Sequence, residues 1–136
     1  MVGMKVEYVG DLRCRAVHGP SGSVIETDAP LDNHGKAERF SPTDLVGAAL
    51  ASCIATVMGI VAQRHNWDLR GMTIDVTKEM SATPPRRIAK LTVDLKMPLN
   101  LPAGDRDQLE RAAHTCPVHK SLHPDIEAPI VFHWPD

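Results

Sequence analysis

The chain has 136 residues, the size of one globular domain, and its 43% hydrophobic and 24% charged content is typical of a soluble protein. Lysine and arginine residues (15) nearly balance aspartate and glutamate residues (17), and the net charge of -2 excludes the basic footprint of a nucleic-acid binder. Three cysteines, an odd number, argue against a disulfide scaffold and leave free thiols as candidates for chemistry.

The first residues of the chain and its overall organisation give two predictions, one on location and one on the number of domains. Residues 1–10 lack the basic and apolar regions of a secretory signal, so we expect a cytoplasmic protein with reduced thiols. No repeat, low-complexity tract or linker divides the sequence, which predicts a single domain over residues 1–136.

Three short strands open the chain. Runs of strand-forming residues at 4–9, 12–18 and 22–28 are separated by glycine-containing turns, which predicts three consecutive strands. Residues 29–40 are mostly polar and include proline and glycine, so we expect a loop between the third strand and the next element.

A long helix follows this loop. Ser41 can act as its N-cap, Pro42 fits the first helical position, and Asp44 lies where the acidic residue of a capping box belongs. The apolar run then continues through Ala62, which predicts a helix that ends near residues 63–66.

Residues 45–62 of this helix carry no charge, which reaches the length of a membrane span. The segment is rich in alanine and glycine, contains Ser52, Cys53 and Thr56, and stands alone between strand-like segments. We therefore expect a buried central helix that is apolar on all sides rather than a membrane span.

The second half of the chain alternates apolar and polar residues at 70–80 and 87–97, which predicts an antiparallel hairpin with one exposed face. A second helix is expected over residues 104–115, and a helical turn follows from Pro117. Residues 126–134 end the chain as a strand, placed at a sheet edge by its internal proline. The order β-β-β-α-β-β-α-β is that of an α+β domain.

The length of the long helix predicts a dimer. About 24 helical residues span about 36 Å, as much as the width of the whole domain. The predicted strands and the one small helix can hardly cover such a helix on every side. We therefore expect a homodimer in which the partner chain covers part of this helix.

Cys53 lies in the middle of the long helix. Free cysteine is among the most buried residue types, so a structural thiol is one interpretation. A reactive thiol would need a nearby cation, because the helix dipole offers little in mid-helix. Arg39 in the preceding loop is the nearest candidate in sequence, and Arg13 and Arg15 of the second strand are the alternatives.

Cys116 precedes Pro117 at a predicted helix start, where unpaired backbone N–H groups can favour a thiolate. The alternative interpretation is a structural cysteine in an N-cap position. Cys14, which lies between two arginines of the second strand, is interpreted as a core or half-buried residue without a role.

The spacing Cys116-x2-His119-x3-His123 is compatible with a zinc site, to which Cys53 or His114 could add a fourth ligand. No CxxC or HxxxH pair elsewhere accompanies this spacing. We therefore expect no metal site, and no cofactor is indicated.

Two motifs resemble those of the OsmC/Ohr family. In residues 40–53, Ser-Pro, two further residues and a leucine open a helix that leads to Cys53, and Cys-Pro-Val at 116–118 followed by Leu122 resembles the second motif. The order of strands and helices also agrees, so the resemblance covers essentially the whole chain. It implies antiparallel sheets packed around a long central cysteine-bearing helix, in an intertwined homodimer with two sites at its interface.

The resemblance also implies a thiol peroxidase. Cys53 matches the peroxidatic position and would attack the O–O bond of a hydroperoxide as a thiolate, becoming a sulfenic acid. Cys116 matches the resolving position and would condense with it to a disulfide, which a dithiol reductant would reduce. Apolar walls around Cys53 would favour organic hydroperoxides, and the two Cα atoms would lie within about 7 Å.

One position departs from the family pattern. Organic hydroperoxide resistance members carry a glutamate that orients the activating arginine where this chain has Thr43, and the acid here is Asp44, one residue later. The arrangement resembles a less characterised OsmC-like branch, with Arg39 and Asp44 as candidate site residues beside the two cysteines. The alternative function is a non-catalytic dimer that binds a small hydrophobic ligand or senses oxidants.

Overall fold

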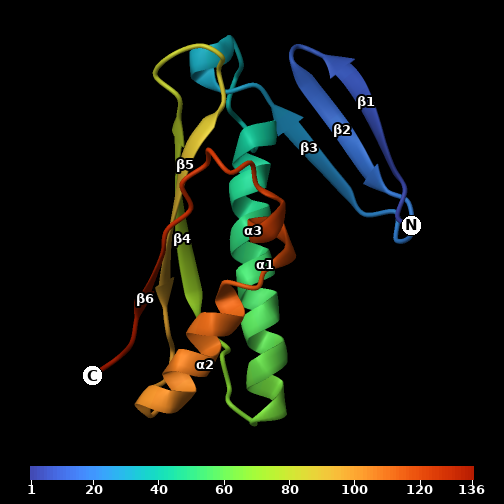
Figure 1. The fold of residues 1–136 in the computed structure, drawn as a ribbon. Helices are drawn as coiled ribbons and strands as arrows, with labels where there is room; N and C mark the ends of the chain where they lie inside the picture. Colours follow the sequence, from blue (N-terminus) through green and yellow to red (C-terminus); the bar gives the residue numbers. More distant parts are fainter. The chain divides into compact units, whose positions relative to one another are not determined.

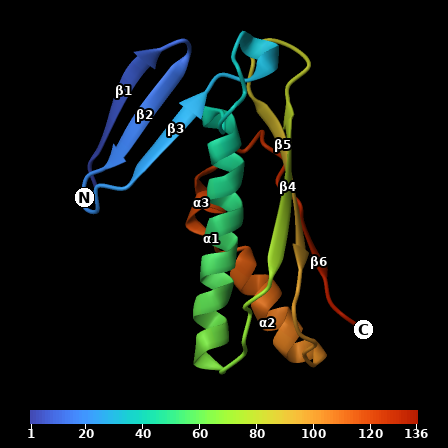
Figure 2. The same ribbon diagram turned by 180° about the vertical axis from the view of Figure 1, so that it is seen from behind.

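The computed structural model describes all 136 residues, which form two compact units, Met1–Val46 and Gly47–Asp136. Each unit contains one three-stranded sheet, and the long helix α1 (Pro42–Arg64) begins in the first unit and continues through the second (Figures 1 and 2). The predicted mixed α+β class is therefore confirmed. A single domain over residues 1–136 stays a prediction.

The sheet of the first unit is an antiparallel meander. Strands β1 (Met4–Gly10), β2 (Arg13–His18) and β3 (Val24–Asp28) lie where the three strands were predicted, and they pair in sequence order. The loop that follows contains a short 3-10 helix, Leu31–Asn33, and is otherwise irregular.

The two faces of this sheet differ in character. The register pairs Val6 with Ala16 and Ala16 with Ile25, so these residues share one face with Met4 and Tyr8. This apolar face is open to solvent, with Val6 63% exposed and Ile25 50% exposed. The opposite face contains the charged residues of the three strands, which are Lys5, Glu7, Arg13, Arg15, Glu26 and Asp28. An exposed apolar surface of this kind usually marks an interaction site.

A reciprocal capping box fixes the start of α1. The backbone N–H of Asp44 donates to Oγ of Ser41 (3.0 Å), and the backbone N–H of Ser41 donates to Oδ2 of Asp44 (2.9 Å). Pro42 occupies the first helical position. The predicted helix start is confirmed, with aspartate in the place that glutamate usually takes.

One face of α1 is buried. Its buried residues recur every three or four positions and are Gly47, Leu50, Ile54, Met58 and Ala62. Gly47 faces the neighbouring sheet, where a Cβ would make ordinary van der Waals contacts with Val76 and Leu91. The other side of α1 exposes Ser52, Thr56 and Ile60.

By length and composition alone, α1 could also cross a membrane, and 28% of its most apolar window is buried in the chain. One such helix is weak evidence for a membrane span, because the mostly buried core helix of a soluble protein passes the same test. The periodic buried residues show that one side of α1 packs within the chain. Within one chain, other residues therefore bury only one face of α1. Burial on all sides, as expected from the sequence, would require a partner chain.

The sheet of the second unit is mixed. Strands β4 (Thr73–Met80) and β5 (Ile88–Lys96) form the predicted antiparallel hairpin, whereas β6 (Ile130–His133) pairs with β5 in the parallel direction. The long connection between β5 and β6 makes parallel pairing possible. The family resemblance implied antiparallel sheets, and the parallel direction of β6 corrects this expectation. The predicted edge position of β6, just after Pro129, is confirmed.

Two helices connect β5 to β6. They are α2 (Ala103–Ala113) and the short α3 (Pro117–Ser121), and both correspond to predicted elements. The α1 helix runs beside β4 and β5 in both views (Figures 1 and 2). The core of this unit is aliphatic, and α1, β5 and α2 supply its fully buried side chains, which include Leu50, Ile54, Met58, Leu91, Val93, Leu95 and Leu109.

Candidate functional site

Cys53 lies in the middle of α1 and is half-buried. Ile54, the next residue, points into the core, whereas Ser52 on the other side is exposed, so Cys53 borders the buried face of the helix. The hydroxyl groups of Ser52 and Thr56 are occupied within the helix, donating to the carbonyls of Ala49 (3.1 Å) and Ser52 (2.7 Å). The Cys53 thiol is therefore the candidate reactive group on this turn of α1.

Cys116 is fully buried and is the N-cap of α3. The backbone N–H of His119 donates to its Sγ at 3.4 Å, and Pro117 follows as the first residue of the helix. The predicted helix start at Pro117 is confirmed. A sulfur atom in this position faces the unpaired N–H groups of the first helical turn.

Cys53 and Cys116 are both free thiols, and the Cys53 thiol lies near enough to Cys116 to affect its pKa. Burial and then the Cys53 thiol raise the pKa of the Cys116 thiol above its ordinary value of 9.0, while backbone N–H groups of His119 and Val118 partly oppose this. Cys116 is therefore a neutral thiol at pH 7. The fold thus brings together two cysteines from distant parts of the sequence.

The histidines near Cys116 have other partners. The Nε2 atom of His119 lies 3.3 Å from the carbonyl oxygen of Ala128, and the His114 ring meets the His119 ring edge-on at a centroid distance of 6.2 Å. No three His, Cys, Asp or Glu side chains form a group that could hold a metal ion. The four-ligand zinc alternative considered for Cys116, His119 and His123 is therefore not assembled here.

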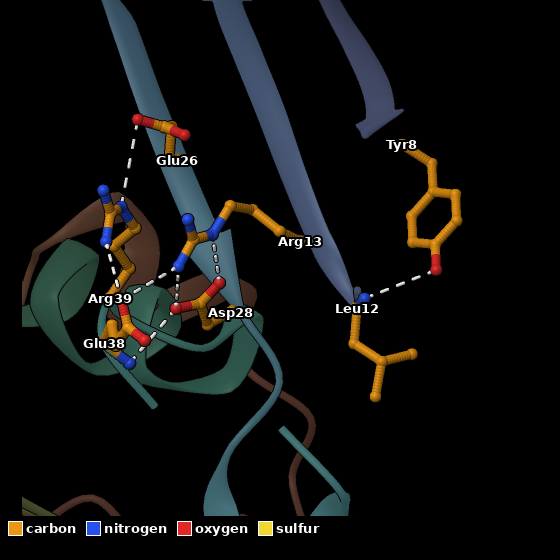
Figure 3. A network of polar contacts seen from close by, with 7 residues as sticks. All are labelled: Tyr8, Leu12, Arg13, Glu26, Asp28, Glu38 and Arg39. Atoms are coloured by element: carbon orange, nitrogen blue, oxygen red, sulfur yellow. Dashed lines mark hydrogen bonds and ion pairs between the residues drawn. The ribbon is translucent and has the colours of Figure 1, made fainter. Parts of the chain in front are cut away.

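A charged network occupies the first unit (Figure 3). Arg13 binds Asp28 through two contacts, from Nε to Oδ1 at 2.6 Å and from Nη2 to Oδ2 at 2.9 Å. Asp28 is 2% exposed and also accepts the backbone N–H of Glu38 at 3.1 Å. The Arg13 hydrogen bonds hold the pKa of the Asp28 carboxyl below its ordinary value, and the same contact raises the pKa of Arg13.

Arg39 belongs to the same network but is held loosely. Its Nη1 lies 3.7 Å from Oε2 of Glu38 and its Nε lies 3.8 Å from Oε1 of Glu26. The Glu38 carboxylate also lies 3.4 Å from Nη2 of Arg13, so it bridges the two arginines (Figure 3). Arg39 is 39% exposed, and its side chain can exchange partners at little cost.

The candidate site residues thus fall into two groups. The cysteines lie in the unit Gly47–Asp136, whereas Arg39 and Asp44 lie in the unit Met1–Val46. Asp44 takes part in the helix cap, where Oγ of Ser41 also lies 3.2 Å from Oγ1 of Thr43. The roles of Arg39 and Asp44 at the cysteine pair stay predictions.

The family model for OsmC-like protein matches residues 34–129, which include both cysteines and the start of α1. The chain belongs to the OsmC family. No protein of curated function matches the sequence.

Solved structures agree with the OsmC assignment. A Psychrobacter arcticus protein named for osmotic stress induction and a detoxification response is 44% identical, with a TM-score of 0.93 and coverage of 98% of this chain and 96% of that chain. The organic hydroperoxide resistance protein OsmC of Legionella pneumophila is 15% identical, with a TM-score of 0.76 and coverage of 97% and 96%. An organic hydroperoxide resistance protein of Elizabethkingia anophelis is 13% identical, with a TM-score of 0.78 and coverage of 99% and 96%. At such low identity the last two show the OsmC fold alone.

Sequence reasoning missed Asp28 and Glu38 as partners of the arginines in this OsmC protein. A hairpin that turns at residues 19–22 pairs Arg13 with Asp28, and the observed register has this pair. The opposite charges at paired positions were therefore a usable signal. Glu38 had no such signal, because it lies in an irregular loop.

Proposed function

We propose that this OsmC family protein is a thiol-dependent peroxidase that reduces organic hydroperoxides with Cys53 and Cys116. The observation that supports the proposal best is the proximity of these two thiols, which come from different helices and are near enough for Cys53 to affect the pKa of Cys116. A peroxidatic cysteine and its resolving partner need such proximity, whereas two structural thiols do not. Proteins named for organic hydroperoxide resistance share the fold.

The first step oxidises Cys53. Its thiolate attacks the terminal oxygen of the hydroperoxide, an S–O bond forms, and the O–O bond breaks. Sulfur loses two electrons and the peroxide gains them. The alkoxide leaves and takes a proton from solvent to become an alcohol, so that Cys53 becomes a sulfenic acid.

The second step closes a disulfide. The Cys116 sulfur attacks the sulfenic sulfur of Cys53, an S–S bond forms, and the S–O bond breaks. The departing hydroxide and the proton of Cys116 form water. A cytoplasmic dithiol reductant, in our proposal, then reduces the disulfide by thiol exchange and is itself oxidised to a disulfide.

Arg39 is the proposed cation that favours the thiolate of Cys53. Its ion pairs with Glu26 and Glu38 are long, so the guanidinium can turn to a stronger partner. Arg13 is the alternative, although its tight pair with Asp28 makes it a less available cation. Asp44 would act by fixing the start of the helix that holds Cys53.

A homodimer is part of the proposal. The exposed side of α1 and the apolar face of the β1–β3 sheet are both open to solvent in one chain, and a second copy could cover them. Apolar surface brought near Cys53 in this way would favour the organic part of a hydroperoxide over hydrogen peroxide.

The test is the stoichiometric reaction of the reduced protein with cumene hydroperoxide. We expect one equivalent of peroxide to remove two thiols per chain and lower the mass by about two hydrogens, the result of sulfenic acid formation and resolution. The Cys53→Ser variant should lose the reaction. In the Cys116→Ser variant, Cys53 should stop at a sulfenic acid that excess peroxide oxidises further.

The matched control is Cys14→Ser, which removes the third thiol and should leave peroxide consumption unchanged. If Cys53→Ser consumes peroxide at the wild-type rate, the proposed chemistry is wrong. If the wild-type protein does not consume cumene hydroperoxide at all, the non-catalytic ligand-binding or oxidant-sensing dimer becomes the better hypothesis.

A further inference from the structure

The segment that leads into β6 is hydrogen-bonded to β5 on one side. The Glu127 carbonyl accepts the backbone N–H of Leu91 at 2.8 Å. Two residues later, the Pro129 carbonyl accepts the backbone N–H of Val93 at 3.0 Å. Because successive carbonyls of an extended segment point in opposite directions, the Ala128 carbonyl points away from β5. The strand β6 is at the edge of the sheet, so no further strand supplies a donor for this carbonyl.

The side chain of His119, on α3, supplies the donor for the Ala128 carbonyl. Its Nε2 lies 3.3 Å from the carbonyl oxygen in a partly buried contact, and because a carbonyl oxygen only accepts, the proton is on Nε2. The His119 ring also packs edge-on against the ring of His114, which in turn meets Phe132 of β6 edge-on at a centroid distance of 6.4 Å. The His119 side chain therefore ties α3 to the open edge of the sheet.

The backbone of His119 contacts the proposed resolving cysteine. Its N–H donates to Sγ of Cys116 at 3.4 Å. The α3 helix has only five residues, and so short a helix is not stable by itself, so its position depends on contacts with the rest of the unit. One residue thus contacts the Cys116 sulfur through its main chain and holds the sheet through its side chain.

We propose that His119 is the positioning residue of the resolving cysteine, because its hydrogen bond to the Ala128 carbonyl holds α3, and with it Cys116, in place for disulfide formation. This inference deepens the proposed peroxidase function and rests on it for its catalytic meaning. In that step the Cys116 sulfur attacks the sulfenic sulfur of Cys53, the S–S bond forms and the S–O bond breaks, and the hydroxide leaves as water with the Cys116 proton. Holding the attacking group in place speeds this step, so that the disulfide forms before peroxide oxidises Cys53 further.

The first test measures how often α3 opens, and it needs no peroxide. In a protein with Cys14→Ser and Cys53→Ser, the one remaining thiol is the fully buried Cys116, so N-ethylmaleimide reaches it only after local opening. Replacing His119 by leucine, or by asparagine, whose amide is too short to reach, should raise the labelling rate about fivefold. Glutamine places an amide N–H near the position of Nε2 and should keep the rate within about twofold of the parent.

The matched control is His123→Leu, which removes an exposed histidine just after α3 and should leave the labelling rate unchanged. Three outcomes would overturn the inference: asparagine and leucine variants that label at the parent's rate, a glutamine variant that labels as fast as the asparagine variant, or an equal rise in His123→Leu. Circular dichroism establishes that each variant is folded. If the leucine variant does not fold, asparagine and glutamine at position 119, which differ by one methylene group, still decide the question.

The second test measures how Cys53 divides between resolution and further oxidation. In the Cys14→Ser protein with excess cumene hydroperoxide, mass spectrometry gives the ratio of the disulfide to the sulfinic acid. His119→Asn should form about fivefold more sulfinic acid per turnover, whereas His119→Gln should not. The stopped-flow rate of the first oxidation should stay the same in both variants, because His119 acts on Cys116 alone, whereas a general loss of structure would slow both steps.

The two tests separate this inference from the proposed function. Faster labelling of Cys116 in His119→Asn with an unchanged ratio of disulfide to sulfinic acid would overturn the positioning role. If the wild-type protein consumes no hydroperoxide, the proposed function fails, and the labelling rates alone then decide whether His119 holds α3 in place.

Discussion

Arg13 and Asp28 form a two-contact ion pair between adjacent strands, with Nε to Oδ1 at 2.6 Å and Nη2 to Oδ2 at 2.9 Å. The carboxylate is 2% exposed and receives a further hydrogen bond from the Glu38 backbone. A buried charge that loses its partner is costly, because water cannot replace the partner. This pair therefore ties the loop before α1 to the strands of the first unit.

The Asp28→Asn variant should destabilise the protein by several degrees in melting temperature. It should also change how the free energy of unfolding depends on pH in acid. The pKa of Asp28 is lowered on folding, so its contribution is complete above its ordinary value of 3.8 and is lost as the pH falls through the lower folded value. Urea unfolding from pH 5 down to about pH 2.5 measures this loss of unfolding free energy.

The matched control for Asp28 is Asp68→Asn. Asp68 also pairs with an arginine, Arg70, which lowers its pKa to about 2, but the pair is exposed on both sides. Exposed ion pairs contribute little to stability. A melting temperature that falls equally in both variants would contradict the special role of the Arg13–Asp28 pair.

Arg39→Gln should lower the rate of peroxide reduction by about tenfold or more, because the thiolate would lose its cation. The melting temperature should hardly change, since both ion pairs of Arg39 are long and partly exposed. Stopped-flow kinetics with cumene hydroperoxide measures the effect. Arg70→Gln, at a side chain that is 91% exposed, is the control that removes a charge of the same sign.

A normal rate in Arg39→Gln together with a large loss in Arg13→Gln would move the role to Arg13. The Arg13 variant must be compared with Asp28→Asn, because both break the same ion pair and only Arg13→Gln removes the cation. Rate losses of equal size in these two variants would indicate a structural effect.

The reduced protein should lose stability at alkaline pH through Cys116. Folding raises the pKa of this thiol, mainly by burial, so its contribution is complete below the ordinary value of 9.0 and is lost as the pH rises toward the folded value. The free energy of unfolding should fall by at most about 1.4 kcal/mol per pH unit in that window. Urea unfolding from pH 8 to about pH 10.5 measures it.

Cys116→Ser should remove this alkaline loss, because serine does not ionise in the window. Cys14→Ser serves as the control, since it removes a thiol from the first unit. If the free energy of unfolding of Cys116→Ser still falls by the same amount at alkaline pH, another group causes the loss.

Local signals explain why much of the fold could be predicted. The capping box of Ser41 and Asp44 and the N-cap position of Cys116 both depend on a few adjacent residues, and both are confirmed. Alternating apolar residues also placed β4 and β5 correctly. Helix caps and strand alternation can be predicted because the residues that cause them lie within a few positions of one another.

Other features depend on contacts between distant segments. The alternation of apolar and polar residues within a strand does not determine the direction of the neighbouring strand. The parallel pairing of β5 with β6 was therefore missed. The proximity of Cys53 and Cys116 followed from the family resemblance rather than from their spacing, because no local pattern joins them. The link from Arg13 to Glu38 depends on how an irregular loop folds back, which no periodicity encodes.

The apolar face of the β1–β3 sheet provides the last prediction, which concerns the homodimer. Val6 lies on this face and is 63% exposed, and a second chain that covers it would exclude water from it. The Val6→Lys variant would place a charge in that contact, at a cost of several kcal/mol if the charge is unpaired. We expect a dimer of the wild-type protein to become a monomer in this variant, as measured by light scattering after size exclusion. Glu7→Lys, the next residue on the opposite face, adds the same side chain and should leave the dimer intact. A wild-type protein that is monomeric at nanomolar concentration, or a Val6→Lys variant that stays dimeric, would contradict this arrangement.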